Sequence, residues 1–139
     1  MGRGTAAQAE RTTRMVAALL DTAIVVDVLC LYPPAVAWLG QQGQLGLSTI
    51  VWLEIIEGAS DRQAEQDALR LLRRFERVET TAEDIDWAIR HVLRLLLSQG
   101  VDAMDCLIAS VIQRMGIPLY TRNLRHFTPL LGDLARQPY

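Results

Sequence analysis

The sequence contains no lysine, and all 14 of its basic residues are arginine. A chain without lysine cannot form a Schiff base with a carbonyl substrate, and it lacks the lysine that binds phosphate in a P-loop. It also lacks the lysine on which a response-regulator receiver domain depends. These three classes of protein are therefore excluded.

A net positive charge is also missing. The formal net charge is −2 and the isoelectric point is about 5.6, so the chain cannot hold a nucleic acid through a general positive field. Any contact with a nucleic acid must instead be made by a few local arginines.

Cysteines are few, and long apolar segments are absent. Cys30 and Cys106 each stand among apolar residues, so we predict two buried free thiols in a reducing compartment, with a disulfide as the alternative. The longest uncharged stretch, residues 28–53, contains Pro33-Pro34 and several glycines and glutamines, which excludes a single membrane helix. The N-terminal residues lack the apolar core of a secretory signal. We therefore expect a cytoplasmic protein with no membrane contact.

The 139 residues suffice for one domain with one core, and half of them are apolar. Residues 1–14 are expected to form a flexible tail, with Met15 as an alternative start. Residues 15–139 are expected to form the single domain. Short apolar runs alternate with amphipathic segments along it, which indicates an α/β fold with a central parallel sheet covered by helices on both faces.

The positions of the strands and helices follow from the same pattern. We expect buried strands at residues 16–20, just before Ser48 and at 117–120, and edge strands at 77–79 and near Leu134. Helices are expected from Thr22 to Pro33-Pro34, over 34–42, from a Ser48 or Thr49 cap to Gly58, over 61–75, from a Thr80 or Thr81 cap to Leu97, and from Asp102 to the break at Gly116.

Two of these helices are expected to bury a continuous apolar stripe. The helix that ends at Leu97 should expose Arg90 and Arg94 and bury Ile85, Ala88, Ile89, Val92, Leu95 and Leu96. The helix that follows should bury Met104, Ile108, Val111 and Met115.

Several carboxylates stand where a charge needs a partner. Asp21 directly follows the first strand, where open α/β sheets place their sites, although it can also cap the next helix. Glu54 lies among apolar residues, so it must be paired, protonated or bound to a metal. Asp105 lies at the margin of an apolar stripe, and Asp102, one turn earlier, is the expected cap. Asp27 is expected on the solvent side of its helix.

The carboxyl ends of parallel strands share one edge of a sheet, so Asp21 and Asn123 are expected at the same edge, with Asp105 and Glu54 around them. Two carboxylates about 5 Å apart repel by roughly 3 kcal/mol at an effective dielectric constant of about 20, so three bare acids would not all stay ionised. Oxygen ligands without Cys or His suit Mg²⁺ or Mn²⁺. Such a metal lowers the pKa of its bound water and supports phosphodiester hydrolysis.

Three blocks of the sequence resemble the PIN-domain family, and in particular the VapC-like endoribonuclease toxins of toxin–antitoxin pairs. They are LLDTAIVVDVL, LSTIVWLEIIEGA and AMDCLIASVIQRMGIPLYTRNLRHF, in the order and at the separations typical of the family. The resemblance implies a three-layer α/β/α sandwich that is usually a homodimer. It also implies a metal-dependent ribonuclease site that a cognate antitoxin holds in check.

By the same resemblance, Asp21, Glu54 and Asp105 are the catalytic carboxylates and the ligands of Mg²⁺ or Mn²⁺. Asn123 or Asp102 is the candidate for a fourth metal ligand. The candidate substrate-binding residues are Thr22, Ser48, Thr121, Arg122 and Arg125.

The sequence departs from the family at three positions. Ala23 replaces an asparagine that often follows Asp-Thr, Asn123 is neutral where some members have an acid, and His126 stands where many have aspartate before phenylalanine. These departures concern metal binding more than the fold.

Other interpretations remain open beside the toxin. The alternatives are a PIN nuclease of RNA maturation and a catalytically silent PIN-fold binding module, and the small, undecorated domain favours the toxin. For a toxin, we expect an antitoxin segment to place an Arg or Lys at the acidic site and to cover apolar surface near Trp38 or Trp52. Weaker candidates for RNA contact are Arg73, Arg74, Arg90 and Arg94. The arginine stripe of the 61–75 helix is interleaved with acids, so a solvated face is its default interpretation.

Overall fold

The computed structural model describes residues 16–139, so the expected tail at 1–14 lies outside the described residues. A five-stranded sheet with the order β3-β2-β1-β4-β5 forms the centre of this part of the chain, and every neighbouring pair of strands is parallel. The strands are β1 (Ala18–Leu20), β2 (Leu45–Ser48), β3 (Glu76–Val78), β4 (Leu119–Tyr120) and β5 (Ala135–Arg136). The predicted parallel sheet and both predicted edge strands are confirmed.

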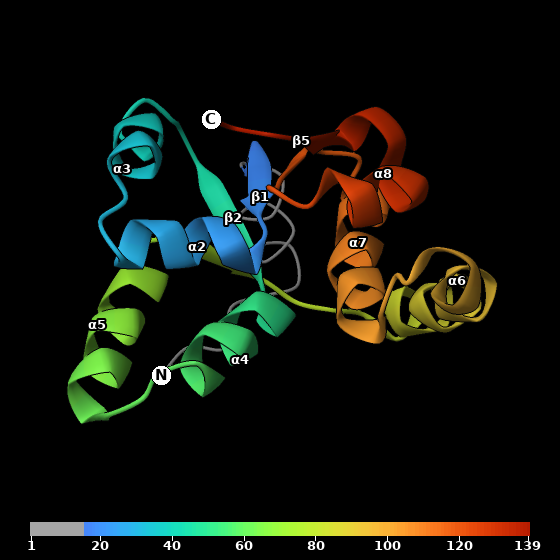
Figure 1. Ribbon diagram of the computed structural model, residues 1–139, viewed down its shortest axis with the longest axis horizontal. Helices are drawn as coiled ribbons and strands as arrows, with labels where there is room; N and C mark the ends of the chain where they lie inside the picture. Colours follow the sequence, from blue (N-terminus) through green and yellow to red (C-terminus); the bar gives the residue numbers. More distant parts are fainter. Residues whose placement is uncertain (1–15) are drawn as a thin grey trace, which may run out of the picture.

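Helices cover the sheet on two sides, with α2 to α5 on one side and α6 to α8 on the other (Figure 1). The helices are α2 (Thr22–Leu29), α3 (Pro33–Leu39), α4 (Thr49–Glu57), α5 (Arg62–Leu72), α6 (Ala82–Gln99), α7 (Ala103–Met115) and α8 (Leu124–Leu131), followed by the 3₁₀ turn η1 (Gly132–Leu134). The predicted α/β/α sandwich is confirmed. Helix α8 was not predicted, because a polar turn was expected after β4.

The central strand β1 is buried on both faces, as its unbroken apolar run predicts. Gly46 of β2 is paired with Leu19 of β1. A Cβ at Gly46 would lie 2.8 Å from the Leu19 Cδ2 atom and 3.1 Å from the backbone oxygen of Glu76. Glycine therefore lets the three strands β1, β2 and β3 approach closely.

The strand order reverses between β1 and β4, which are neighbours in the sheet. It runs from β1 outward through β2 to β3, then returns to place β4 and β5 on the other side of β1. Leu20 and Tyr120 are register partners at the carboxyl ends of β1 and β4. The loops after these two strands therefore lie side by side at a topological switch point, where open α/β sheets form binding sites.

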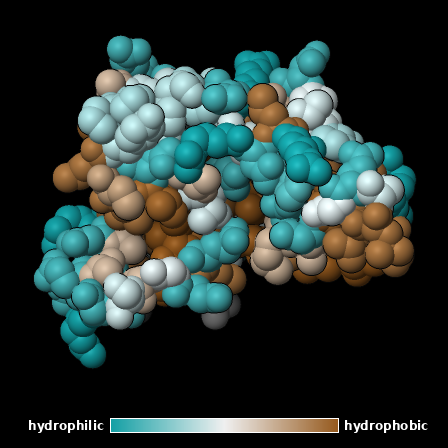
Figure 2. Space-filling model, in the orientation of Figure 1, coloured by the Kyte–Doolittle hydropathy of each residue, from teal (hydrophilic) through white to brown (hydrophobic). Residues whose placement is uncertain are grey.

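Helix α6 exposes residues that were predicted to be buried. Ala88 and Leu95 are buried, but Ile85, Ile89 and Leu96 are about half exposed, at 46%, 53% and 44%. The reason is that α7 is the main element packed on α6 and covers only one side of it. Figure 2 shows the resulting hydrophobic patch over α6.

Other burial predictions were also wrong at the margins of the fold. Met104, in the first turn of α7, is 43% exposed, whereas Ile108 and Val111 of the same helix are buried as predicted. Both cysteines are free, but only Cys106 is buried, and Cys30 is exposed at the end of α2. Burial raises the pKa of the Cys106 thiol to about 11, so it stays protonated.

Residues 16–139 contain one bent pair of apolar helices, α2 and α3. No single helix there is long and apolar enough to cross a bilayer, although α2 and α3 together, bent by 108°, reach the required length and composition.

Candidate active site

Asp21 is the residue that joins β1 to α2, and it lies where the two strands β1 and β4 end. Its Oδ1 atom accepts a hydrogen bond of 2.8 Å from the backbone N–H of Thr22, which makes it the N-cap of α2. Its Oδ2 atom accepts a 2.8 Å hydrogen bond from the hydroxyl of Thr121. The cap is confirmed, and the site role of this side chain, which is only 7% exposed, stays a prediction.

Two backbone groups fix the position of Thr121, the residue after β4. Its backbone N–H donates to the carbonyl of Arg136 in β5, and its own hydroxyl accepts from the backbone N–H of Asn123. The side chain is fully buried. The contact between Thr121 and Asp21 is therefore held by the sheet itself.

Glu54 reaches the same site from α4. The hydroxyl of Thr22 donates a 2.8 Å hydrogen bond to its Oε1 atom, so Thr22 joins Glu54 to the turn that carries Asp21. Ser48 caps α4 by accepting from the backbone N–H of Val51, and it is 1% exposed. A substrate contact at Ser48 stays a prediction, because the contact observed there is a helix cap.

Asp105 enters the site from the first turn of α7. Asp102 is the N-cap of this helix and accepts a 2.9 Å hydrogen bond from the backbone N–H of Asp105, as predicted. The Oδ2 atom of Asp105 lies 2.9 Å from the Nδ1 atom of His126 in α8. The cap uses one oxygen of Asp102, and the pairing with His126 uses one oxygen of Asp105.

His126 is a site residue that sequence reasoning missed. From the sequence it was treated only as a departure from the family. The available signal was a histidine shortly after β4, which can pair with a carboxylate of the site. Its Nδ1 atom also lies 3.0 Å from the amide of Asn123. Which group donates in these two contacts depends on the tautomer of the ring. Asn123 therefore touches the site through His126.

Burial is the main cause of raised pKa values at all three carboxylates. It raises the pKa of Asp21, against the opposing hydrogen bond from Thr121, and repulsion by Asp105 raises it further. Burial likewise raises the pKa of Glu54, and Asp21 adds repulsion. At Asp105, burial comes first and repulsion by Asp102 second. The three acids thus share one field that favours binding of a cation.

The donor set fits a hard divalent ion by its chemistry. Asp21, Glu54 and Asp105 offer carboxylate oxygens, and Glu54 and Asp105 each keep one oxygen that makes no side-chain hydrogen bond to residues 16–139. As these side chains stand, no three His, Cys, Asp or Glu residues in the described part of the chain are close enough to hold a metal. Metal binding would have to draw the three carboxylates together.

Arg122 lies in the loop after β4 and Arg125 in the first turn of α8, and both are exposed. The Nε atom of Arg122 lies 3.0 Å from the Oδ2 atom of Asp27 in α2. The expectation that Asp27 faces solvent was wrong, since its side chain is only 13% exposed. Arg122 also lowers the pKa of Asp21 by its charge, although burial outweighs this effect.

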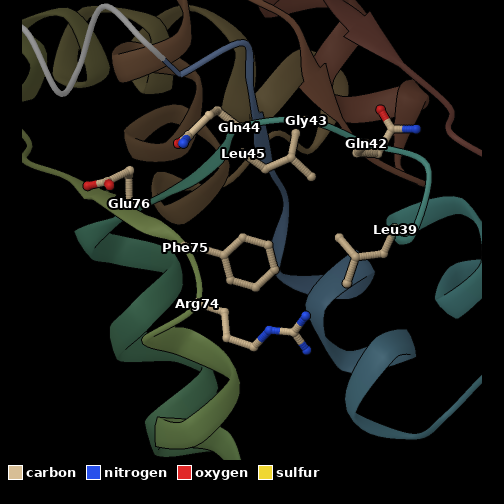
Figure 3. Close-up of a pocket in the computed structure, with 8 residues that line it drawn as sticks. All are labelled: Leu39, Gln42, Gly43, Gln44, Leu45, Arg74, Phe75 and Glu76. Carbon is tan, nitrogen blue, oxygen red and sulfur yellow. The ribbon is translucent and has the colours of Figure 1, made fainter.

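One cavity of the structure is lined by a candidate carboxylate, and another lies away from all three. One of about 260 Å³ lies between α2, α4 and α5, and Glu54 lines it beside apolar residues such as Val26, Leu29 and Ile55. The other, of about 320 Å³, is lined by Leu39, residues 42–45 and residues 74–76 (Figure 3). It lies at the amino ends of β2 and β3, opposite the edge that carries Asp21. Arg74 points into this second cavity, away from the candidate active site.

The model of one protein family, described as the PIN domain, matches residues 18–128. None of the curated proteins matches this chain by sequence.

Among solved structures, a toxin–antitoxin complex from Klebsiella pneumoniae is similar, with 24% identity, coverage of 88% of this chain and 98% of the other, and a TM-score of 0.74. DNA-bound VapBC from Salmonella typhimurium has 21% identity, with 90% and 100% covered and a TM-score of 0.72. VapBC2 from Rickettsia felis, bound to a promoter DNA fragment, has 23% identity, with 86% and 97% covered and a TM-score of 0.68.

Proposed function

Because this chain belongs to the PIN-domain family, we propose that it is a metal-dependent endoribonuclease and the toxin of a toxin–antitoxin pair. One observation carries the proposal. Asp21, Glu54 and Asp105 lie around the switch point of the sheet, and burial, with added repulsion from a nearby carboxylate, raises the pKa of each. Such a cluster favours a hard cation, and a hard cation beside exposed arginines favours a phosphodiester substrate.

The residues of the chain supply orientation and charge for this reaction. Thr121 and Thr22 fix the carboxylates of Asp21 and Glu54, and His126 fixes that of Asp105. We expect these three carboxylates to hold Mg²⁺ or Mn²⁺, which when bound supplies an activated water and neutralises the phosphate. Arg122 and Arg125 then hold neighbouring phosphates of the RNA by charge-assisted hydrogen bonds.

The test is cleavage of single-stranded RNA by the purified protein with Mg²⁺ or Mn²⁺. Asp105→Asn should lower the rate at least about 100-fold, because a metal ligand is lost. Asp102→Asn is the matched control on the same turn, and it should leave the rate nearly unchanged because asparagine also caps helices well. Cleavage that continues at the wild-type rate in excess EDTA would contradict the proposal.

An antitoxin is the proposed protein partner. The similar structures include toxin–antitoxin complexes, and the cavity between α2, α4 and α5 combines apolar walls with the carboxylate of Glu54. An apolar helix or strand with one Arg or Lys fits both features. We propose this cavity as an antitoxin contact, and the surface near Trp38 or Trp52, whose rings pack against Tyr120 and Arg77, stays a predicted one.

A second copy of the chain is the proposed partner of the patch on α6 and the start of α7. Its exposed apolar members are Ile85, Ile89, Leu93, Leu96, Leu97 and Met104. A contiguous exposed apolar patch of this kind is typical of a protein–protein contact, whereas apolar side chains exposed singly need no partner.

Charges on α6 favour a second copy in an antiparallel orientation. Exposed Glu83 and Asp86 lie in the first half of the helix, and exposed Arg90 and Arg94 lie in the second half. When two such helices pair antiparallel around a two-fold axis, the acids of each copy face the arginines of the other. The same surface is thus complementary to itself.

A catalytically silent binding module is the second candidate. The observation that favours it is the lack of three converging metal-binding side chains in residues 16–139. Calorimetric titration of Mn²⁺ into the metal-free protein distinguishes the two functions. Measurable binding that is lost in Asp105→Asn supports the nuclease, and no binding at all supports the silent module.

A further inference from the structure

Asp27 lies under the guanidinium of Arg122 and is held there by a second group. The Nε atom of Arg122 is 3.0 Å from the Oδ2 atom of Asp27, and the hydroxyl of Tyr139 donates a 2.5 Å hydrogen bond to the same oxygen. Asp27 comes from α2 and Arg122 follows β4, while Tyr139 lies beyond β5. Three separate segments of the chain therefore meet at one carboxylate.

Aromatic contacts fix the position of Tyr139. Its ring lies 6.0 Å from that of Tyr32 and 6.2 Å from that of Trp38, both with edge-to-face geometry. Trp38 in turn contacts Tyr120, which precedes Thr121 of the candidate active site, at 4.8 Å. Burial and the bond to Asp27 raise the pKa of Tyr139, so its hydroxyl remains a donor at neutral pH.

This arrangement leaves one side of the Arg122 guanidinium available. Asp27 pairs with Nε, and within residues 16–139 neither Nη atom has a hydrogen-bond acceptor. The Arg122 side chain is 48% exposed and lies close enough to Asp21 to affect its pKa. An arginine held through Nε can offer its two Nη donors to a phosphate. Because its long side chain is already ordered, binding costs less conformational entropy.

We propose that Asp27 and Tyr139 are positioning residues that hold Arg122 ready for an RNA phosphate beside Asp21. The inference rests on the proposed function, because it takes single-stranded RNA as the ligand. Neither residue touches the RNA itself, and both act only through Arg122.

The sign of one substitution separates this role from simple electrostatics. Asp27→Asn removes a negative charge near the RNA, and charge alone predicts tighter binding. Loss of a positioned arginine predicts the opposite, namely a rise of about three- to ten-fold in the dissociation constant. Tyr139→Phe keeps the aromatic ring and removes only the hydroxyl, so it should weaken binding by about two-fold through the same route.

The experiment measures binding of a fluorescently labelled single-stranded RNA oligonucleotide of mixed sequence to the full chain, in EDTA, by fluorescence anisotropy. In the Arg122→Ala background, Asp27→Asn and Tyr139→Phe should no longer weaken RNA binding, because their effect on positioning acts through Arg122. A purely structural role would instead add its loss to that of Arg122→Ala. The melting temperature of each variant verifies that it is folded.

Glu79→Gln is the matched control. Glu79 pairs with the Nε atom of Arg77 at the same distance of 3.0 Å, but next to β3 and away from the loop after β4. It should leave RNA binding unchanged or slightly tighter. The inference is overturned if Asp27→Asn binds RNA as tightly as the wild type or more tightly, or if it still weakens binding in the Arg122→Ala background.

The readout keeps this inference separate from the nuclease proposal. Binding in EDTA does not require metal or cleavage, so the result for Asp27 stands even if the chain proves to be a silent RNA-binding module. If the wild type binds no RNA, the inference about Arg122 fails together with the choice of RNA as ligand. If it binds RNA but does not cleave it with Mg²⁺ or Mn²⁺, only the nuclease proposal fails.

Discussion

Hydroxyl and imidazole groups, rather than arginines, hold the three candidate carboxylates in place. Thr121 and Thr22 donate to Asp21 and Glu54, and His126 pairs with Asp105. Hydroxyl donors orient a carboxylate without cancelling its charge. The site therefore keeps its attraction for a cation while the positions of its ligands stay restricted.

At the scale of single residues, the fourth metal-ligand position is open to a direct test. Asn123 brings no charge, so the site has about three carboxylates if Asp102 serves only as a cap. Asn123→Asp should tighten Mn²⁺ binding about ten-fold, because affinity in such sites rises with the number of carboxylates, and it should destabilise the metal-free protein by repulsion. Asp102→Asn should change the affinity little.

Calorimetric titration of Mn²⁺ into both variants distinguishes the two positions. A large loss of affinity in Asp102→Asn without a gain in Asn123→Asp would assign the fourth position to Asp102.

At the scale of secondary-structure elements, an ion pair joins the start of α6 to α7. The Nε atom of Arg114 lies 2.9 Å and 3.0 Å from the two carboxylate oxygens of Asp84, which is 1% exposed. Arg114 also donates to the backbone carbonyl of Glu79. Asp84 completes the capping box of α6 with Thr81. One arginine thus connects α7 to both the cap of α6 and the end of β3.

Removal of this arginine should destabilise the fold. Arg114→Ala leaves the Asp84 carboxylate buried without its partner, and the expected loss is roughly 2 to 4 kcal/mol in the free energy of unfolding. Arg70→Ala is the control, since Arg70 pairs with Asp67 at an exposed position and should cost well under about 1 kcal/mol. Urea denaturation measures both. Equal losses in the two variants would show that the buried pair contributes no more than a surface pair.

The exposed face of α6 gives a second prediction at this scale. Asp86→Arg should weaken self-association, because two arginine-rich halves then meet in the antiparallel pair. Arg94→Asp should do the same, and the combined variant should restore association, since both signs are exchanged. Sedimentation velocity of each variant measures the oligomeric state. A combined variant that stays as weak as the single ones would exclude the antiparallel pairing of α6.

At the scale of the whole molecule, the stability of the metal-free protein should depend on pH through its acidic site. Burial raises the pKa of Asp21 and Asp105 above 3.8 and that of Glu54 above 4.5, so the folded state keeps protons that the unfolded chain has released. The resulting stabilisation is complete below these ordinary values and is lost as pH rises through the raised ones. A divalent ion binds the ionised form and should reverse the loss.

Thermal unfolding in EDTA measures this effect against Asp21→Asn, which cannot ionise at that position. The variant should gain stability over the wild type at about pH 7 and lose most of that advantage at about pH 4. Mn²⁺ should raise the melting temperature of the wild type at about pH 7 and have little effect at about pH 4. A difference between the two proteins that is independent of pH would contradict the assigned cause.

The sequence by itself determined the elements and the candidate carboxylates, because both depend on local order along the chain. Unbroken apolar runs predicted β1 and β4, and Ser48 and Asp102 were predicted as caps from their places before helices. Asp21 directly follows β1, so its place at the edge of a parallel sheet followed once the sheet was expected. The family resemblance then gave the PIN fold, which the structure confirms.

Only the tertiary structure decided which side chains meet across the chain. Asp27 looked solvent-facing within α2, and its burial comes from Arg122 and Tyr139, which lie far along the sequence. His126 contacts Asp105 only because α8 returns beside α7. The apolar stripe of α6 is periodic enough to be a core face, yet α7 covers only one side of it. Periodicity states which residues share a face, and the neighbour that packs there decides whether that face is buried.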